Sequence, residues 1–514
     1  MLTRLKVSGF KNLVDVDVRF GPFTCIAGPN GVGKSNLFDA IRFLSALADR
    51  PLMEAALSVR GDENGGRMAD VRSLFQRYGD QYASEMTFEA EMIVPSQGED
   101  DLGQKATATN TFLRYTLNLA YRKDQNLSSL GSLEVLKEEL DYTTVTSAPK
   151  HLLFPHSLLW RKSAVLGRRK GKQFISTEGE DEARVVQLHQ DGGSRGRPLW
   201  QVKKLNRTVL STTNTSESPT ALLARREMLS WRLLQLEPSA LRKPDEFSAP
   251  TKLGPNGSHL AATLYRLAYE NGSKKISDTQ NPKVCSVVAN RLGGLIDDVY
   301  RVSIDRDEKR ELLTLNVMGR DKTPHAARSL SDGTLRFLAL AVLEQDPEVQ
   351  GVLCLEEPEN GIHPARIPAM IKLLRHIVTD VDEPVGTENP LRQVIVNTHS
   401  PSVVQQVYDE NLLVAEPKEF VEEEQRFTGV CFSCLADTWR AAEPQQKVDI
   451  CRRGDLLAYL NPVLPSEYAG EEDAAQVSVS QKNKKLARPR RVIDREDITP
   501  YLPFSQTQSP NQDE

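Results

Sequence analysis

The sequence has no apolar run long enough to form a membrane-spanning helix, which argues against an integral membrane protein. Its first residues, Met-Leu-Thr-Arg-Leu-Lys, indicate a strand and lack the apolar core of a signal peptide. The net charge is −5, so no global basic field attracts nucleic acid, and any such contact would use local patches. We therefore expect a cytoplasmic protein with no membrane contact.

Cysteine is also scarce, with six scattered residues. Cys25 and Cys354 lie inside apolar runs typical of strands, so we expect them to be small core residues. Cys431 and Cys434 form a single CxxC pair, and Cys451 would add only one more sulfur. A structural zinc site usually takes four ligands from two such pairs. Reduced thiols are therefore the favoured interpretation, and bound zinc is the alternative.

The two ends of the sequence show a regular alternation of strand and helix patterns. Apolar periodicity predicts strands at 2–7, 13–20, 23–27, 85–94, 111–121 and 133–142, and a helix from 34 to about 48. After residue 331 the expected order is helix 333–345, strand 352–355, helix 364–378, strand 393–398, helix 401–408 and strand 411–415. This order predicts an α/β fold with a mixed sheet and an antiparallel β subdomain.

The middle of the sequence is less regular. Between 145 and 220, short strands alternate with polar turns. Helical patterns then cover 220–234, 259–269 and 282–296, and strands return at 299–305 and 311–317. No helical pattern sustains four heptads, so a long coiled coil is not expected. The segment 466–514 is polar, and we expect it to be disordered.

A glycine-rich segment after the third predicted strand carries the strongest chemical signal. Gly-Pro-Asn-Gly-Val-Gly-Lys-Ser fits the phosphate-binding loop (P-loop) pattern completely, between a strand and a helix. Its glycines let backbone N–H groups turn toward a phosphate, and the helix points its N-terminus at the same anion. Lys34 would bind the β and γ oxygens and Ser35 would bind Mg²⁺. The expected nucleotide contacts are Gly28, Pro29, Asn30, Gly31, Val32, Gly33, Lys34, Ser35 and Asn36.

Two adjacent carboxylates, Glu356 and Glu357, follow the apolar run Gly-Val-Leu-Cys-Leu. A strand that is buried on both faces gives such a continuous apolar run. Its carboxyl end falls beside the P-loop in open α/β sheets. One carboxylate can then hold the metal, and the other can orient and deprotonate a water. A solvated acidic turn is the alternative interpretation.

Two further segments complete a resemblance to ABC-type ATPases. Leu-Ser-Asp-Gly-Thr at 330–334 resembles the ABC signature, although a simple helix N-cap is an alternative. His399 ends the strand Gln-Val-Ile-Val-Asn-Thr and resembles the switch histidine; a locally bonded histidine is its alternative. The four motifs stand in the ABC order. Asp332 and Thr334 depart from the LSGGQ form that transporters use.

The resemblance implies a role for each matched residue. Glu357 matches the catalytic glutamate and His399 the γ-phosphate sensor, while Ser331 and Gly333 match the part that contacts the nucleotide of a second subunit. Glu356 stands where the family usually has aspartate and is a metal ligand together with Ser35. Gln76 is the candidate for the metal-binding glutamine of the Q-loop, with an ordinary polar surface residue as the alternative.

The late position of the signature and the turn Glu-Pro-Glu-Asn-Gly-Ile-His-Pro are similar to the RecF/SMC/OLD-like branch, often catalogued as AAA-type ATPases without a transporter. This branch implies an N-terminal ATPase lobe at 1–145, an inserted β and helical lobe at 146–320, and a C-terminal ATPase lobe at 321–465. No Asp-x-Asp follows His399, so the nuclease domain of OLD proteins is not expected.

Standalone ATPases of this branch include the PtuA ATPase of Septu antiphage systems and a related ATPase of some retrons, which this chain resembles. The resemblance implies ATP and Mg²⁺ as cofactors, a head-to-tail dimer around ATP, and an HNH nuclease partner in antiphage defence. The alternatives are a RecF/SMC-like DNA repair or loading ATPase and a slow ATP-dependent binding switch.

Two basic stretches are candidates for contact with DNA or RNA, although a solvated charge run is the alternative for both. The first contains Arg161, Lys162, Arg168, Arg169, Lys170 and Lys172, and the second contains Lys482, Lys484, Lys485, Arg488, Arg490 and Arg491.

Overall fold

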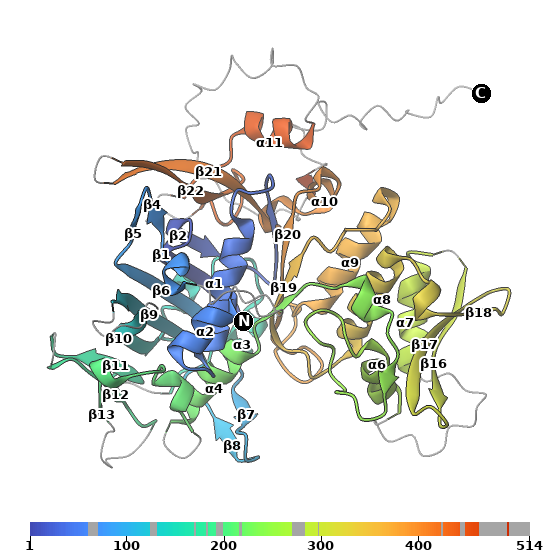
Figure 1. The fold of residues 1–514 in the computed structure, drawn as a ribbon, viewed down its shortest axis with the longest axis horizontal. Helices are drawn as coiled ribbons and strands as arrows, with labels where there is room; N and C mark the ends of the chain where they lie inside the picture. The colour runs from blue at the N-terminus through green and yellow to red at the C-terminus, as the bar shows by residue number, and fades with distance from the viewer. Residues whose placement is uncertain are drawn as a thin grey trace.

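The computed structural model has two lobes joined by a six-stranded sheet (Figure 1). It describes residues 1–59, 70–123, 131–168, 171–180, 183–191, 199–214, 218–269, 283–296, 298–422, 425–442, 448–461 and 491–492. The predicted disordered tail lies outside these residues apart from 491–492, as do Arg169, Lys170 and the second basic stretch except Arg491. Within the described part of the chain, no helix is long and apolar enough to cross a membrane.

An eight-stranded antiparallel sheet fills the first lobe, in the order β13-β12-β11-β10-β9-β6-β1-β2. Its strands are β1 (Leu2–Phe10), β2 (Leu13–Arg19), β6 (Glu85–Ile93), β9 (Phe112–Arg122), β10 (Ser132–Tyr142), β11 (Ile175–Glu178), β12 (Val185–Leu188) and β13 (Leu199–Gln201). Two small hairpins lie beside it, β4 (Arg77–Tyr78) with β5 (Gln81–Tyr82) and β7 (Gln97–Glu99) with β8 (Lys105–Thr107).

The joining sheet has the order β14-β19-β20-β3-β21-β22, and all neighbours are parallel except the last pair. Its strands are β14 (Arg232–Leu234), β19 (Gly351–Glu356), β20 (Arg392–Thr398), β3 (Phe23–Ala27), β21 (Leu412–Glu422) and β22 (Gln425–Cys434). The second lobe carries β15 (Asp245–Glu246), β16 (Val299–Asp307), β17 (Leu312–Gly319) and β18 (Pro324–Ala326).

The helices cover both faces of the joining sheet (Figure 1). The first lobe holds α1 (Lys34–Leu47), α2 (Leu52–Ser58), α3 (Leu158–Ala164) and α4 (Pro219–Leu229). The second lobe holds α5 (Pro238–Leu241), α6 (Leu260–Tyr269), α7 (Lys283–Gly293), α8 (Asp332–Gln345) and α9 (Ile367–Ile377). Near the carboxyl ends of the parallel strands lie α10 (Pro401–Gln406) and α11 (Arg453–Leu460).

Alternation along the parallel strands divides their side chains between two cores. Ile26, Val352 and Ile395 face the core that also contains α1 and the eight-stranded sheet. Their neighbours Cys25 and Leu353 face the core of the second lobe, with α8 and α9. A strand buried on both faces needs apolar residues at consecutive positions. The continuous apolar runs seen in the sequence therefore follow from this position between two layers.

The fold class predicted from the sequence is confirmed, and most predicted elements agree within a few residues. One prediction is wrong: the helix expected over 220–234 ends at Leu229, and Arg232–Leu234 form β14. Ser230 follows as the C-cap, and Leu233 then pairs in parallel with Cys354. Tertiary pairing overrides the helical propensity of this leucine-rich segment.

The predicted inserted lobe at 146–320 is distributed over three sheets. Strands β11–β13 continue the eight-stranded sheet, because Ile175 pairs with Leu140 across the predicted boundary at 145. β14 joins the six-stranded sheet, and only the segment from β15 onward forms the separate small sheet. Hydrogen-bonded pairing therefore continues across residue 145. The predicted boundaries remain a hypothesis about domains.

Candidate functional site

Parallel register brings the ends of three strands to one edge of the joining sheet. Glu356 of β19 pairs with Asn397 of β20, and Thr398 of β20 pairs with Ala27 of β3. The next residues along each strand are Glu357, His399 and Gly28. Three segments that are far apart in the sequence thus meet at the carboxyl edge, where open α/β sheets bind ligands.

The P-loop, residues 28–35, bends at three glycines. Gly28, Gly31 and Gly33 have φ of 156°, 79° and 108°, a region that side chains with a Cβ rarely adopt. A Cβ at Gly28 would also lie 2.5 Å from the carbonyl oxygen of Ala415, which the neighbouring strand β21 contributes. The predicted loop is therefore present; backbone angle favours glycine at all three positions, and space also requires it at Gly28.

The Lys34 side chain folds back across the P-loop. Its Nζ donates to the carbonyl oxygens of Gly28 at 2.7 Å and Pro29 at 2.8 Å. Gly33 caps α1 without a side-chain hydrogen bond, so the first N–H groups of the helix remain available to an anion. Burial lowers the pKa of Lys34, while Glu357, Glu359 and Glu356 act in the opposite direction. A phosphate would replace the two carbonyls as a stronger partner for this ammonium.

Two carboxamides hold Glu356. The Nε2 of Gln235, directly after β14, donates to its Oε2 at 2.6 Å. The Nδ2 of Asn397 lies 3.4 Å from its Oε1 and 3.5 Å from the Ser35 hydroxyl. Asn397 is buried at 3% exposure, so it links the P-loop serine to the end of β19. The Ser35 hydroxyl and the Glu356 carboxylate therefore lie beside the same Asn397 NH₂ group and supply the oxygen donors at this point, while the two carboxamides orient them.

Those donors suit Mg²⁺, which usually takes one or two carboxylates, substrate phosphates and water. Ser35, Glu356 and Asn397 line a cavity of about 410 Å³ together with Gln235, Glu357 and Arg336. The extra methylene of Glu356 relative to aspartate is accommodated by Gln235 and Asn397, which hold its two oxygens. The residues thus fit a magnesium ion that would bind through one carboxylate and one hydroxyl.

Glu357 is held from two sides at the mouth of this cavity. Its Oε1 lies 2.6 Å from His399 Nδ1, and its Oε2 accepts from Asn360 Nδ2 at 2.8 Å. Its backbone is left-handed at φ 45°, and its N–H donates to the Asn397 carbonyl at 3.0 Å. Burial acts to raise the pKa of Glu357, but the hydrogen bonds from Asn360 and His399 outweigh it, so the pKa is lowered. The group is therefore an ionised carboxylate whose direction is fixed by two hydrogen bonds.

Glu359, two residues further on, has a different environment. It is 6% exposed, accepts from the Thr398 hydroxyl through Oε1, and has no hydrogen-bond partner at Oε2 among the described residues. Burial raises its pKa. Neighbouring carboxylates with opposite shifts are typical of sites that use charge. Of the two carboxyl groups, Glu357 is the one that ionises more readily.

The signature-like segment begins α8. Ser331 is exposed and is the N-cap, and its Oγ accepts the N–H of Thr334 at 3.3 Å, so the N-cap alternative is correct as local structure. Gly333 packs on the turn after Glu357: a Cβ at Gly333 would lie 2.1 Å from the Gly361 carbonyl oxygen. No residue of 330–334 lines the cavity that contains Ser35, as far as the described chain shows.

Gln76 lies elsewhere. It is buried just after a 3₁₀ turn (Val71–Leu74), and its N–H donates to the Gly9 carbonyl at 2.9 Å. Gln76 is 4% exposed, so the surface-residue alternative is wrong. It does not line the cavity that contains Ser35, and its metal role stays a prediction. Gln235 is the glutamine that contacts Glu356. The position of Gln235 directly after a short strand could have identified it, but the sequence predicted that strand, β14, as part of a helix.

Of the remaining candidates, Cys25 and Cys354 are buried core residues, as predicted. No group of three or more His, Cys, Asp or Glu residues that could hold a metal occurs in the described part of the chain, and the described cysteines are free thiols. From the first basic stretch, Lys162, Arg168 and Lys172 are exposed and Arg161 is half-buried. Contact of these residues with nucleic acid stays a prediction.

Two family models match the chain. One, described as "AAA domain, putative AbiEii toxin, Type IV TA system", matches residues 219–405, and another, described as "AAA domain", matches residues 4–142. The OLD nuclease of Thermus scotoductus is 51% identical over 41 residues, 8% of each chain. The DNA replication and repair protein RecF of Clavibacter sepedonicus is 25% identical over 233 residues, 43% of this chain and 55% of that protein.

Among solved structures, an SMC head bound to the C-terminal winged-helix domain of ScpA covers 84% of this chain and 98% of its own, at 12% identity and a TM-score of 0.42. The chain spans at most about half the length of the two curated relatives named above. The matches nevertheless confirm the resemblance to RecF/SMC/OLD-like ATPases that the motifs indicate.

Proposed function

We propose, on the premise that this chain carries AAA-type ATPase domains of the RecF/SMC/OLD-like kind, that it binds ATP with Mg²⁺ and hydrolyses it. The observation that supports this most directly is the position of Glu357. It stands one residue beyond β19, held by His399 and Asn360, at the edge where β3 enters the P-loop.

The P-loop and α1 supply the binding energy. When phosphate enters, the Lys34 ammonium exchanges the carbonyls of Gly28 and Pro29 for phosphate oxygens, which are charged acceptors. The free N–H groups at the start of α1 then face the anion. Mg²⁺, when bound at Ser35 and Glu356, neutralises charge on the β and γ phosphates.

Glu357 orients the attacking water and takes its proton. A lowered pKa keeps the carboxylate ionised at neutral pH. The hydrogen bond from His399 and that from Asn360 fix its direction, and fixed geometry supplies much of the rate enhancement in phosphoryl transfer.

A second copy of the chain would complete the site. Ser331 is exposed at the N-terminus of α8 but lies outside the cavity of its own chain. A helix N-terminus with exposed N–H groups suits the γ-phosphate of a partner molecule. In the proposed dimer, Ser331 and Gly333 of one copy therefore close over the nucleotide held at Lys34 of the other.

Closing and opening of this dimer would gate a partner. From the resemblance to standalone antiphage ATPases, we propose an HNH-type nuclease as that partner, with DNA or RNA as its target. The RecF-like alternative, loading onto DNA without a nuclease, is compatible with the same site. Nuclease activity that depends on ATP would favour the nuclease partner. Binding of gapped DNA by the ATPase alone would favour the RecF-like alternative.

The test of the ATPase itself is single-turnover hydrolysis of Mg-ATP by the purified full chain. The parent protein should release phosphate, while Glu357→Gln should bind ATP and release almost none. A slow binding switch would instead bind ATP with little release by either protein. Absence of Mg-ATP binding by the parent would refute the proposal.

A further inference from the structure

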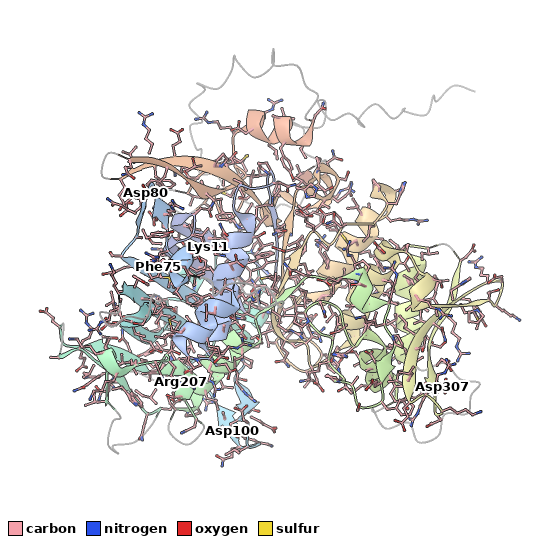
Figure 2. The ribbon with its side chains drawn as sticks, viewed as in Figure 1. Lys11, Phe75, Asp80, Asp100, Arg207 and Asp307 are labelled. Carbon is pink, nitrogen blue, oxygen red and sulfur yellow. The ribbon has the colours of Figure 1, made fainter. Side chains whose placement is uncertain are left out.

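The turn between β1 and β2 is anchored on three sides next to the P-loop. Lys11 is left-handed at φ 49°, donates its N–H to the Leu74 carbonyl at 2.8 Å and forms an ion pair with Asp39 of α1. Lys11 lies over α1 in Figure 2. The carbonyl of Asn12 accepts the N–H of Val430 at 3.1 Å. These contacts therefore fix the position of the turn backbone from which the Asn12 side chain extends.

From this fixed turn, the Asn12 carboxamide forms hydrogen bonds with the P-loop and with the start of α1. Its Nδ2 donates to the carbonyl oxygen of Val32 at 2.9 Å, and its Oδ1 accepts from Asn36 Nδ2 at 2.7 Å. Since Val32 offers an oxygen, only the NH₂ side of the amide can face it, which settles the orientation. A Cβ at Gly33 would lie 2.2 Å from Asn12 Nδ2, so the contact also requires glycine there.

A planar trans peptide links this contact to phosphate binding. In the Val32–Gly33 peptide, the C=O and the N–H point in opposite directions. Because Asn12 holds the Val32 oxygen, the Gly33 N–H must point away from the turn. Lys34 ties the other half of the loop through the Gly28 and Pro29 carbonyls, which a phosphate can take over. Asn12 bonds the half of the loop that Lys34 leaves free.

We propose that Asn12 is a positioning residue that aims the Gly33 N–H at the nucleotide phosphate. The inference rests on the proposed function, since it concerns the same loop. Asn12 touches neither the catalytic carboxylate nor the magnesium ligands in the contacts described above. Its effect therefore falls on nucleotide affinity and not on the chemical step.

The test measures ADP and ATP affinity by calorimetry, without turnover, on the full chain. Asn12→Ala should weaken both roughly 10-fold, the effect of losing about one hydrogen bond to a charged ligand. Asn12→Asp should weaken them further, because a carboxylate repels the Val32 oxygen and the phosphate. Asn36→Ala should also weaken both affinities, since it removes the bond that orients Asn12 and Asn36 is itself an expected nucleotide contact, so the two Asn12 variants decide the test.

Asn389→Ala is the matched control. It loses amide hydrogen bonds to Asp380 and Glu383 at 2.8 and 3.0 Å, near the amino end of β20 and away from the P-loop. Its nucleotide affinity should equal that of the parent. In steady state, Asn12→Ala should raise KM about 10-fold with kcat changed less than about 2-fold.

If Asn12→Ala binds nucleotide as the parent does, or lowers kcat at unchanged KM, the inference is overturned. A loss of nucleotide affinity in Lys34→Ala would still support the proposed binding site in that case. Failure of the parent to bind Mg-ATP would instead remove the proposed function. If Asn12→Ala does not fold, Asn12→Asp keeps its size and its bond to Asn36. Equal affinity of Asn12→Asp and the parent would then overturn the inference.

Discussion

His399 Nδ1 lies 2.6 Å from Glu357 Oε1, although the two residues follow different strands, β20 and β19. Asn360 occupies the second oxygen at 2.8 Å. The base is thus oriented by a histidine at the end of β20 and by the turn that follows β19. A change at either donor is expected to alter the direction of Glu357 as well as its charge.

Glu357→Gln should abolish hydrolysis and preserve binding. Glutamine keeps the size of the side chain but cannot accept a proton from water, and loss of a general base costs about 10² to 10⁴ in rate. We expect ATP to hold the variant as a dimer, detected by light scattering with size-exclusion chromatography. Phosphate release at the parental rate would refute the assignment of the base.

Lys34→Ala should lose nucleotide affinity by roughly 100-fold, the effect of removing a charge-assisted hydrogen bond pair. The ammonium is replaced by a methyl group, and the carbonyls of Gly28 and Pro29 lose their shared donor. Calorimetric titration with ATP measures the change. Circular dichroism serves as the folding control, and unchanged affinity in a folded variant would contradict the prediction.

Asn397→Ala and Gln235→Ala should each raise the Mg²⁺ concentration for half-maximal ATPase activity. Both carboxamides hold Glu356, and removal of such supporting groups typically weakens a metal site roughly 10- to 100-fold. Mn²⁺ binding measured by electron paramagnetic resonance, with ADP present, gives a readout independent of turnover. Gln76→Ala is the matched control, and an equal effect in Gln76→Ala would reinstate it as the metal-linked glutamine.

Gly333→Ala should disturb the catalytic turn, because the new Cβ would meet the Gly361 carbonyl oxygen at 2.1 Å. Overpacking of this kind costs about 1–3 kcal/mol, which thermal unfolding can detect. We expect slower hydrolysis as well, since Gly361 follows the turn that orients Glu357. Gly386→Ala, where a Cβ meets nothing within 4 Å, is the control. Equal melting temperatures and rates in both variants would count against the contact.

The free energy of unfolding should decrease as pH rises, because of the buried carboxyl group of Glu138. Burial raises its pKa from 4.5 to about 7, although it accepts the N–H groups of Val209 and Leu210 at 2.7 and 2.8 Å. Between these pKa values the folded state binds more protons than the unfolded state, so the free energy of unfolding falls as pH rises, by about 3 kcal/mol in all. Glu138→Gln should lack this part of the slope between about pH 5 and 8. The free energy of unfolding is measured by urea denaturation at each pH. The same dependence on pH in both proteins would refute the prediction.

The positions of the motifs assigned to nucleotide binding and hydrolysis were predictable because each motif depends on a short local pattern. The P-loop needs glycines at fixed spacing, and Glu357 follows a strand whose burial on both faces is visible as an apolar run. The geometry that joins Glu356, Glu357 and His399 follows from parallel strands, which share one carboxyl edge.

Gln235, Asn397 and Asn12 were not predictable in the same way. Gln235 reaches Glu356 only because β14 pairs with β19, and the leucines of that segment equally suit a helix. Asn397 and Asn12 act through contacts with segments far along the chain, which no local spacing encodes. The assignment of Gln76 from the sequence could not draw on such contacts and stays a prediction.

The central position of β3 has a consequence for synthesis on the ribosome. Both of its neighbours, β20 and β21, belong to the C-terminal part of the chain. The emerging β3 therefore has no partner strand until translation has passed Thr398, and it lacks its second partner until Val414, although the antiparallel first lobe can begin to pair well before that. Premature termination anywhere before β20 therefore yields a product in which β3 has no partner strand and the edge that carries Gly28, Glu357 and His399 is not assembled.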